Sequence, residues 1–284
     1  MRLSSKRVNI LFVYHKIFIR KICNPFMVYE VKHSDYSKHS HLFKSSGPEG
    51  ALLENAFSHD FISQTLYVDD LNHSSIALLK LPIVFLLVGN PESPSLNSLL
   101  EIIPNKSGFT FPHTDNWLSQ MKKYRPMLSV KWSSNYMSHQ SLKIDHIQEL
   151  SKTIPKDYNV KRVTENNINE LPEEICSHIP RNFGSFENFL KYGIGFCIME
   201  GDKPINLASS LLPYTNKLEV YIVTVKDEKY RKKGFATIAC AKLLEFCLNE
   251  GIEPYWSAMN EASLKLATKL GYENPTLFHV YEKK

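Results

Sequence analysis

The sequence has no paired set of cysteines. Its five cysteines are odd in number and scattered, and none forms a Cys-x-x-Cys pair; they are Cys23, Cys176, Cys197, Cys240 and Cys247. We therefore expect neither a disulfide framework nor a cysteine-based metal site. Buried, reduced thiols in a cytoplasmic protein that binds no metal are the prediction instead.

Long hydrophobic runs are also missing. No stretch approaches the roughly 20 apolar residues that span a bilayer. The longest candidate, Ile76–Val88, is interrupted by Lys80 and Pro82 and is typical of buried strands. We therefore expect no membrane partner. Internal repeats and low-complexity tracts are absent as well.

Acidic residues are absent from residues 1–26, which hold six of the basic residues behind the formal net charge of +5. The rest of the chain is close to neutral, so we expect no nucleic-acid partner. The basic leader fits a transit-like segment, or an extension upstream of a native first residue at Met27. Its apolar part, Val8–Tyr14, is short and lacks a small-residue cleavage site, which argues against secretion. The extension is the preferred interpretation.

The length and the patterning indicate two α+β parts after this leader. A chain of 284 residues with 43% hydrophobic and 22% charged residues suits two globular domains. Ser151–Lys156 is polar and contains Pro155, so we place the boundary there and predict domains at 27–151 and 152–284. In the first, strands are predicted at 65–69, 76–80, 83–89 and 128–132, and helices at 97–103 and 114–123.

The second domain is predicted to run β-α-α-β-β-β-α-β-α and to end in a strand. The strands are expected at 158–163, 194–200, 205–212, 218–225, 253–258 and 277–282. The first two helices are expected at 165–179 and 185–192, a long one after residue 234 and the last after residue 260.

A basic loop, Tyr230–Thr237, lies between the strand 218–225 and the long helix that ends near Gly251. The first turn of a helix has backbone N–H groups without internal partners and a partial positive charge, so it can bind a phosphate. Gly234 lets the main chain approach an anion, and the neighbouring cations balance its charge. The alternatives are a lone Gly-rich turn and an ordinary exposed charged loop.

The spacing Arg231-x-x-Gly234-x-Ala236 resembles the pyrophosphate loop of the GCN5-related N-acetyltransferases (GNAT). The preceding strand, the following helix, the short strand 253–258 and the segment Asn260–Tyr272 with its Leu-Gly-aromatic ending resemble the same family. The resemblance implies a mixed, mostly antiparallel sheet flanked by helices. Ser185–Phe196 is similar to two-part bacterial members, whose first half resembles a degenerate copy of the fold.

The resemblance implies acetyl-CoA as co-substrate, held where the fourth and fifth strands splay apart. Backbone groups of Val223, Thr224 and Val225 would pair with the pantetheine arm and polarise the acetyl carbonyl. Asn260 would contact the pantetheine or order the last helix; the alternative is a simple N-cap. The pyrophosphate would be held by Arg231, Lys232, Lys233, Gly234, Phe235, Ala236 and Thr237.

Two residues on the fourth strand are catalytic candidates. Glu219 lies where the family often has an acidic residue that acts as base through water, and a partly apolar cleft would raise its pKa. A solvated charge at a strand end is the alternative. Tyr221 would take the polar position if Lys226–Lys229 holds an extra residue. Ala267 stands where many members carry the tyrosine that protonates the leaving thiolate, so that acid is absent.

The resemblance therefore predicts an enzyme that moves an acetyl group from acetyl-CoA to an amine of a small molecule, a metabolite or an antibiotic-like compound. We expect it to act as a monomer or a homodimer. Three alternatives stay open: an amino-acid N-acyltransferase of the glycine N-acyltransferase-like type, a protein amine acetyltransferase, and a non-catalytic acyl-CoA sensor.

Overall fold

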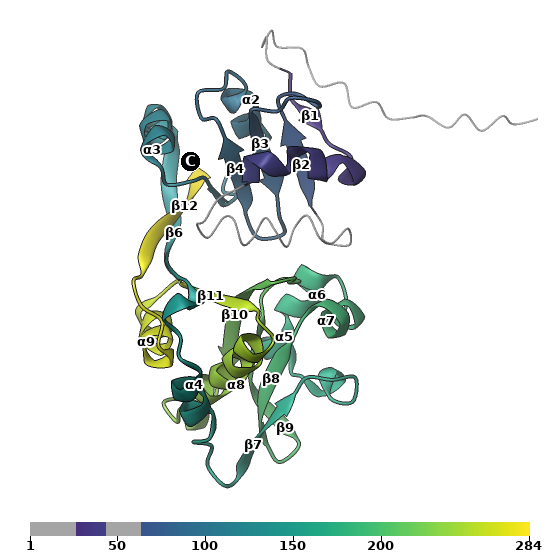
Figure 1. Ribbon diagram of the computed structural model, residues 1–284, viewed down its shortest axis with the longest axis vertical. Helices are drawn as coiled ribbons and strands as arrows, with labels where there is room; N and C mark the ends of the chain where they lie inside the picture. The colour runs from purple at the N-terminus through teal and green to yellow at the C-terminus, as the bar shows by residue number, and fades with distance from the viewer. Residues whose placement is uncertain (1–26, 44–63) are drawn as a thin grey trace, which may run out of the picture.

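The computed structural model describes residues 27–43 and 64–284; the predicted leader 1–26 lies outside them. Two α+β lobes are joined by one sheet with the strand order β1-β2-β3-β4-β5-β12-β6-β11-β10-β9-β8-β7 (Figure 1). Most neighbouring strands in it are antiparallel; β4–β5 and β10–β11 are parallel. The predicted mixed, mostly antiparallel sheet flanked by helices is confirmed.

Residues 27–151 form most of the first lobe. They fold into β1 (Tyr29–Glu30), η1 (His33–Phe43), β2 (Thr65–Val68), β3 (Ile76–Lys80), β4 (Phe85–Gly89), α2 (Leu96–Ile102), β5 (Phe109–Thr110), α3 (Asp115–Met121), η2 (Lys122–Met127), β6 (Leu128–Met137), η3 (His139–Ser141) and α4 (Ile144–Ser151), of which α4 lies in the second lobe. The residues of β3 and β4 are buried on both faces, and two apolar clusters pack against opposite sides of these strands. This explains why the run from Ile76 to Val88 is apolar on both faces.

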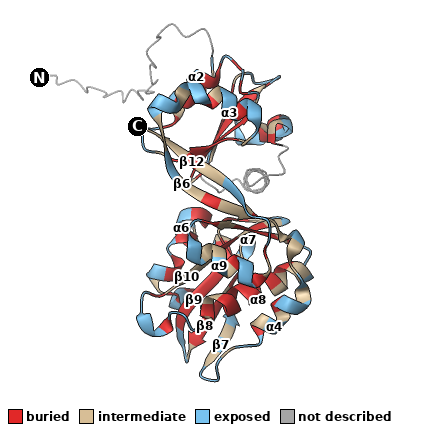
Figure 2. Ribbon diagram, turned by 90° about the vertical axis from the view of Figure 1, so that its left-hand side faces the viewer, coloured by how far each residue is buried: buried red, intermediate tan, exposed pale blue. Residues whose placement is uncertain are grey.

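The second lobe has one large core. Residues 152–284 fold into β7 (Tyr158–Arg162), η4 (Ile168–Glu170), α5 (Glu173–Cys176), α6 (His178–Phe183), α7 (Phe186–Tyr192), β8 (Gly195–Glu200), β9 (Lys203–Ser210), β10 (Lys217–Thr224), η5 (Glu228–Tyr230), α8 (Phe235–Asn249), β11 (Glu253–Ala258), α9 (Glu261–Leu270) and β12 (Thr276–Lys283), of which β12 lies in the sheet of the first lobe. Buried residues concentrate in β8, β9 and α8 (Figure 2).

Helices cover both faces of the central strands. On one face, Phe246 of α8 contacts Phe196 of β8, with ring centroids 6.2 Å apart. On the other, His178 of α6 hydrogen-bonds to Ser209 of β9 at 3.0 Å. Since side chains alternate along a strand, odd-numbered residues of β10 such as Tyr221 face α6, and even-numbered ones face α8.

Two strands tie the lobes together. β6 pairs with β11 through Trp256–Ala258, and β12 pairs with β6 along its full length and with β5 at Tyr281. The chain end therefore completes the sheet of the first lobe, and Val280 lies in that lobe's core. Helix α4 packs on α8 of the second lobe. The division at 151/152 stays a prediction, with the added observation that both sides of it contribute to each lobe.

Local signals placed three helices correctly. Thr114, Ser185 and Asn260 each accept a hydrogen bond from the backbone N–H three residues on, as N-caps do. The expected helix 165–179 is wrong. The chain forms η4, α5 and α6 there, because Pro172 has no N–H to donate and a turn from Asn167 to Leu171 precedes it. The strand expected at 128–132 continues to Met137.

Candidate functional site

A cavity of about 700 Å³ opens where β10 and β11 diverge. The two strands pair in parallel only from Lys217–Glu253 to Glu219–Tyr255. Beyond that point β10 stays with β9, and β11 turns to β6. The cavity is lined by Val220, Tyr221, Ile222, Val223, Thr224, Tyr230, Arg231, Lys232, Lys233, Gly234, Phe235, Ala236, Thr237, Trp256, Ser257, Met259, Asn260, Ala262, Ser263, Leu266 and Lys269.

The structure thus brings most of the sequence-predicted binding residues to one cavity. Thr224, all of Arg231–Thr237 and Asn260 line it, together with Tyr221 and Val223. Val225 and Glu219 are not among the lining residues. The roles assigned to these residues from the sequence stay predictions.

The register of β10 corrects the backbone groups expected to meet a pantetheine arm. The N–H of Val225 donates to the carbonyl of Ile205, and the carbonyl of Glu219 accepts from Leu211, both in the direction of β9. Main-chain groups alternate in direction along an antiparallel ladder. The peptide groups of Val223 and Val225 therefore face β9, while those of Ile222 and Thr224 face the cavity. The strand pattern alone could not reveal this, because the alternation depends on which neighbour pairs first.

The basic loop forms the end of the cavity at the start of α8. Gly234 is the N-cap of that helix in the left-handed region, with φ 83° and no side-chain cap, and Lys232 is also left-handed at φ 57°. Nothing lies within 4 Å of the point where a Cβ on Gly234 would stand. The residues of the first turn, Phe235–Thr237, line the cavity together with Arg231, Lys232 and Lys233. Since the N–H groups of a helix's first turn have no partners within the helix, this arrangement suits an anionic phosphate.

The Glu200 carboxylate anchors this loop through hydrogen bonds. The Tyr230 hydroxyl donates to its Oε2 at 2.6 Å, Lys229 Nζ donates to the same atom at 3.2 Å, and the Tyr158 hydroxyl donates to Oε1 at 3.1 Å. The Tyr230 hydrogen bond is the main cause that lowers the pKa of this carboxyl below its ordinary value. The ring of Tyr158 also packs on Phe235, with centroids 4.5 Å apart. Sequence reasoning missed Glu200, whose partners are distant along the chain.

Helix α9 forms the facing wall. Asn260 Oδ1 accepts from the N–H of Ser263 at 2.9 Å, so the N-cap interpretation holds, and Asn260 lines the cavity as well. The Ser263 hydroxyl accepts from Trp256 Nε1 at 2.9 Å and also lines the cavity. Ala267, one turn further, is fully buried. The i+3 spacing from Asn260 was the sequence signal for Ser263.

Glu219 lies at the apex of the gap, opposite Tyr255. Burial raises the pKa of its carboxyl to about 7, and hydrogen bonds from Ser257 and Tyr255 partly offset the rise. The Tyr255 hydroxyl falls outside ordinary hydrogen-bond geometry, so Ser257 is the stronger partner. Ser257 lines the cavity, so the carboxyl lies next to a residue of that space. A carboxyl of this kind can accept a proton near neutral pH.

His178 is a site neighbour that sequence reasoning did not select. Its ring lies 4.3 Å from that of Tyr221, and Ser209 holds its Nε2. Burial lowers the pKa of His178 to about 3, so the imidazole is neutral and supports Tyr221 without adding charge. No sequence spacing links α6 to β10, and only the packing of the helix on the sheet brings them together.

Among residues 27–43 and 64–284, no group of three or more His, Cys, Asp and Glu side chains has a metal-binding arrangement. None of the helices formed by these residues combines the length and the hydrophobicity that a membrane span requires. The four described cysteines, Cys176, Cys197, Cys240 and Cys247, are buried free thiols.

Known proteins share this chain's sequence and architecture. An uncharacterised N-acetyltransferase of Bacillus subtilis, YdfB, is 28% identical over 186 residues, which cover 64% of this chain and 68% of that protein. The crystal structure of a GCN5-related N-acetyltransferase-like protein from Streptococcus suis superposes with a TM-score of 0.68 at 26% identity, over 88% of this chain and 99% of that one.

A tandem GNAT protein from the clavulanic acid biosynthesis pathway has a TM-score of 0.63 at 9% identity, over 90% of this chain and 97% of that one. That likeness supports a fold built of two parts. The sequence profile of the GNAT acetyltransferases matches residues 40–281, which span both lobes. Because this match covers most of the chain, and β10 and β11 splay apart at the cavity, the chain belongs to the GNAT acetyltransferase family.

Proposed function

We propose that this acyltransferase moves the acetyl group of acetyl-CoA to the amine of a small molecule. The observation that carries the proposal is the cavity between β10 and β11. It has a cationic helix N-terminus, and it is also lined by Ser257, a neighbour of the half-buried Glu219 carboxyl.

The residues present fit a CoA pyrophosphate and pantetheine. The open position over Gly234, the amides of Phe235–Thr237 and the three cations of the loop match a diphosphate in charge and in hydrogen-bond donors. The peptide groups of Ile222 and Thr224 suit an amide-containing arm laid along the free edge of β10. When bound, acetyl-CoA supplies the electrophilic thioester.

Glu219 is suited to remove the proton that the amine must lose. Its raised pKa keeps the carboxyl close to half-ionised at neutral pH, where a general base works best. Tyr221, supported by His178, and Ser257 border the same region and are suited to orient the amine or a bridging water.

The position of the first lobe favours a small acceptor. Tyr136 of β6 packs on Tyr255 with ring centroids 5.7 Å apart, so a strand of the first lobe borders the face that carries Glu219. We infer that this strand restricts the approach of a long protein segment to the carboxyl. A small amine needs only the space beside the gap.

The direct test measures binding and turnover separately. Acetyl-CoA at 100 times its dissociation constant should stabilise the fold by about 2.7 kcal/mol, seen as a rise in melting temperature. A screen of small amines should then release free CoA thiol faster than the slow background with water. If acetyl-CoA binds but no amine causes release of free CoA thiol, the protein would be an acyl-CoA sensor and not an enzyme. Turnover only with protein amines would overturn the small acceptor.

A further inference from the structure

A second cavity of about 400 Å³ lies in the first lobe, between the α3–η2 segment and the strands β6 and β12. It shares no residue with the cavity between β10 and β11. A volume of this size suits a small organic molecule. Its lining residues are Phe111, Leu118, Met121, Lys122, Arg125, Leu128, Ser129, Val130, His279 and Tyr281.

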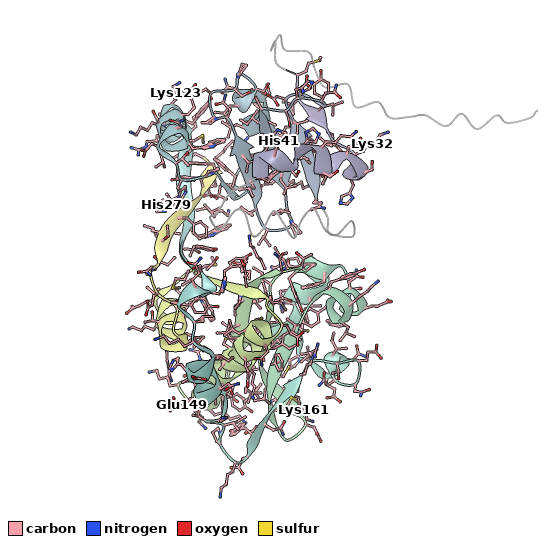
Figure 3. All side chains as sticks on the ribbon, viewed as in Figure 1. Lys32, His41, Lys123, Glu149, Lys161 and His279 are labelled. Carbon is pink, nitrogen blue, oxygen red and sulfur yellow. The ribbon has the colours of Figure 1, made fainter. Side chains whose placement is uncertain are left out.

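One wall of this cavity is aromatic. The ring of Tyr281 is stacked on Phe111, with centroids 5.1 Å apart and an interplanar angle of 14°, and His279 lies 6.0 Å from Tyr281 edge-on. Phe111 is buried, whereas Tyr281 and His279 keep part of their surface exposed. His279, labelled in Figure 3, forms a hydrogen bond through Nδ1 with the Ser133 hydroxyl at 2.8 Å, which orients the ring. A flat ring can stack on this wall.

The rim adds two exposed apolar side chains. Leu118 of α3 is 39% exposed and Val130 of β6 is 50% exposed. Both line the cavity, Leu118 from α3 and Val130 from β6. Apolar side chains left open around a concave aromatic wall gain free energy when a ligand covers them.

The charge at the cavity has one sign. Lys122 and Arg125 line it, and its lining includes no Asp or Glu. Within the described part of the chain neither cation forms an ion pair with a carboxylate. Arg125 and Tyr281 line the same cavity. Burial raises the pKa of the Tyr281 hydroxyl, and the positive charge of Arg125 partly offsets that rise. An anionic group beside that wall would be paired by Arg125.

We propose that this cavity binds a small planar aromatic carboxylate. The ring lies against Tyr281 and His279 and between Leu118 and Val130, and the carboxylate lies at Arg125 and Lys122. The site belongs to the first lobe and is separate from the cavity between β10 and β11.

The test uses indole-3-acetate as the probe and indole-3-acetamide as its neutral match, with the full-length protein and isothermal titration calorimetry. We expect the acid to bind with a dissociation constant of about 1 mM or tighter. The amide should bind at least about fivefold more weakly, since it has no charge for Arg125. Saturating CoA should leave the affinity for the acid unchanged.

Arg125→Gln should weaken binding of the acid about tenfold. Lys123→Gln is the matched control, because Lys123 is the exposed neighbour of Lys122 and does not line the cavity (Figure 3). If Arg125→Gln fails to fold, Lys122→Gln serves instead, with a smaller loss expected.

Four results would overturn the proposal. They are no saturable binding of the acid at several millimolar, equal binding of acid and amide, an equal loss in Lys123→Gln and Arg125→Gln, and competition between the acid and CoA. Competition with CoA would mean that the probe binds in the cavity between β10 and β11.

Discussion

At the scale of single residues, an experiment can separate the effect of Gly234's backbone conformation from the effect of its place in the cavity. It shares with Gly251 a left-handed φ, 83° against 71°, and open space around a would-be Cβ. The two glycines bracket α8, and only Gly234 lines the cavity. A side chain at either costs about 1 kcal/mol in backbone strain.

We therefore expect Gly234→Asp to weaken CoA binding about 100-fold or more, because it sets a carboxylate where the diphosphate would lie. Gly251→Asp should lower the melting temperature as much as Gly234→Asp does, but it should leave the affinity for CoA unchanged. Isothermal titration with CoA and thermal unfolding measure the two effects. Equal affinities in both variants would show that the diphosphate binds elsewhere.

Glu219 links burial to pH dependence at the same scale. Its folded pKa of about 7 lies above its ordinary value, so the folded state favours the protonated carboxyl. The contribution of this group to folding stability is fully present below its ordinary pKa. That contribution is lost as the pH rises through the folded pKa of about 7. Activity runs in the opposite direction, because a base must be ionised.

The rate constant kcat/KM should thus rise with pH and level off above about 7. Glu219→Gln should lose about 100-fold in kcat at neutral pH and lose the inflection, with rate recovering at high pH as the amine deprotonates itself. The variant should also be more stable than the wild type at pH 8. A pH profile unchanged by the substitution would remove the base role.

At the scale of elements, the loop between β10 and α8 owes its shape to a carboxylate on β8. Glu200 accepts from side chains of β7 and of η5, so one anion connects three elements below the cationic loop. Because its pKa is lowered, its stabilising effect is present at neutral pH and is lost as the pH falls through the lowered value.

Glu200→Gln should therefore loosen the loop and weaken CoA binding several-fold while the amine KM stays unchanged. Glu228→Gln is the control, since Glu228 is exposed and pairs only with Arg231, at 3.3 Å, among the described residues. Hydrogen exchange of the loop amides measures the loosening. Similar exchange in both variants would mean that Glu200 does not order the loop.

At the scale of the whole molecule, the sheet crosses the boundary expected from the sequence. β12 lies between β5 and β6, and β6 borders β11. Trp132 and Phe278 pack against the first lobe's core, while Met137 lies in the core of the second.

Residues 27–151 and 152–284 expressed separately should each fail to fold cooperatively. The first piece lacks β12, which separates β5 from β6, and the second lacks β6 and α4. Far-UV circular dichroism and thermal melts of the two pieces against the full chain make the test. A sharp transition in either piece would restore the boundary at 151/152 as that of an independent domain.

The sequence by itself determined the features whose interactions span a few residues. The caps at Thr114, Ser185 and Asn260 and the left-handed Gly234 act within one helical turn, so they can be predicted from neighbours alone. The apolar alternation of the central strands placed them within a residue or two, and the loop motif led to the correct family.

Only the tertiary structure decided which distant groups meet. Which face of β10 carries its free peptide groups, the support of Tyr221 by His178, and the place of β12 beside β5 all depend on packing between segments far apart in the chain. Such contacts are selected by the burial of whole faces, which no single stretch of sequence contains.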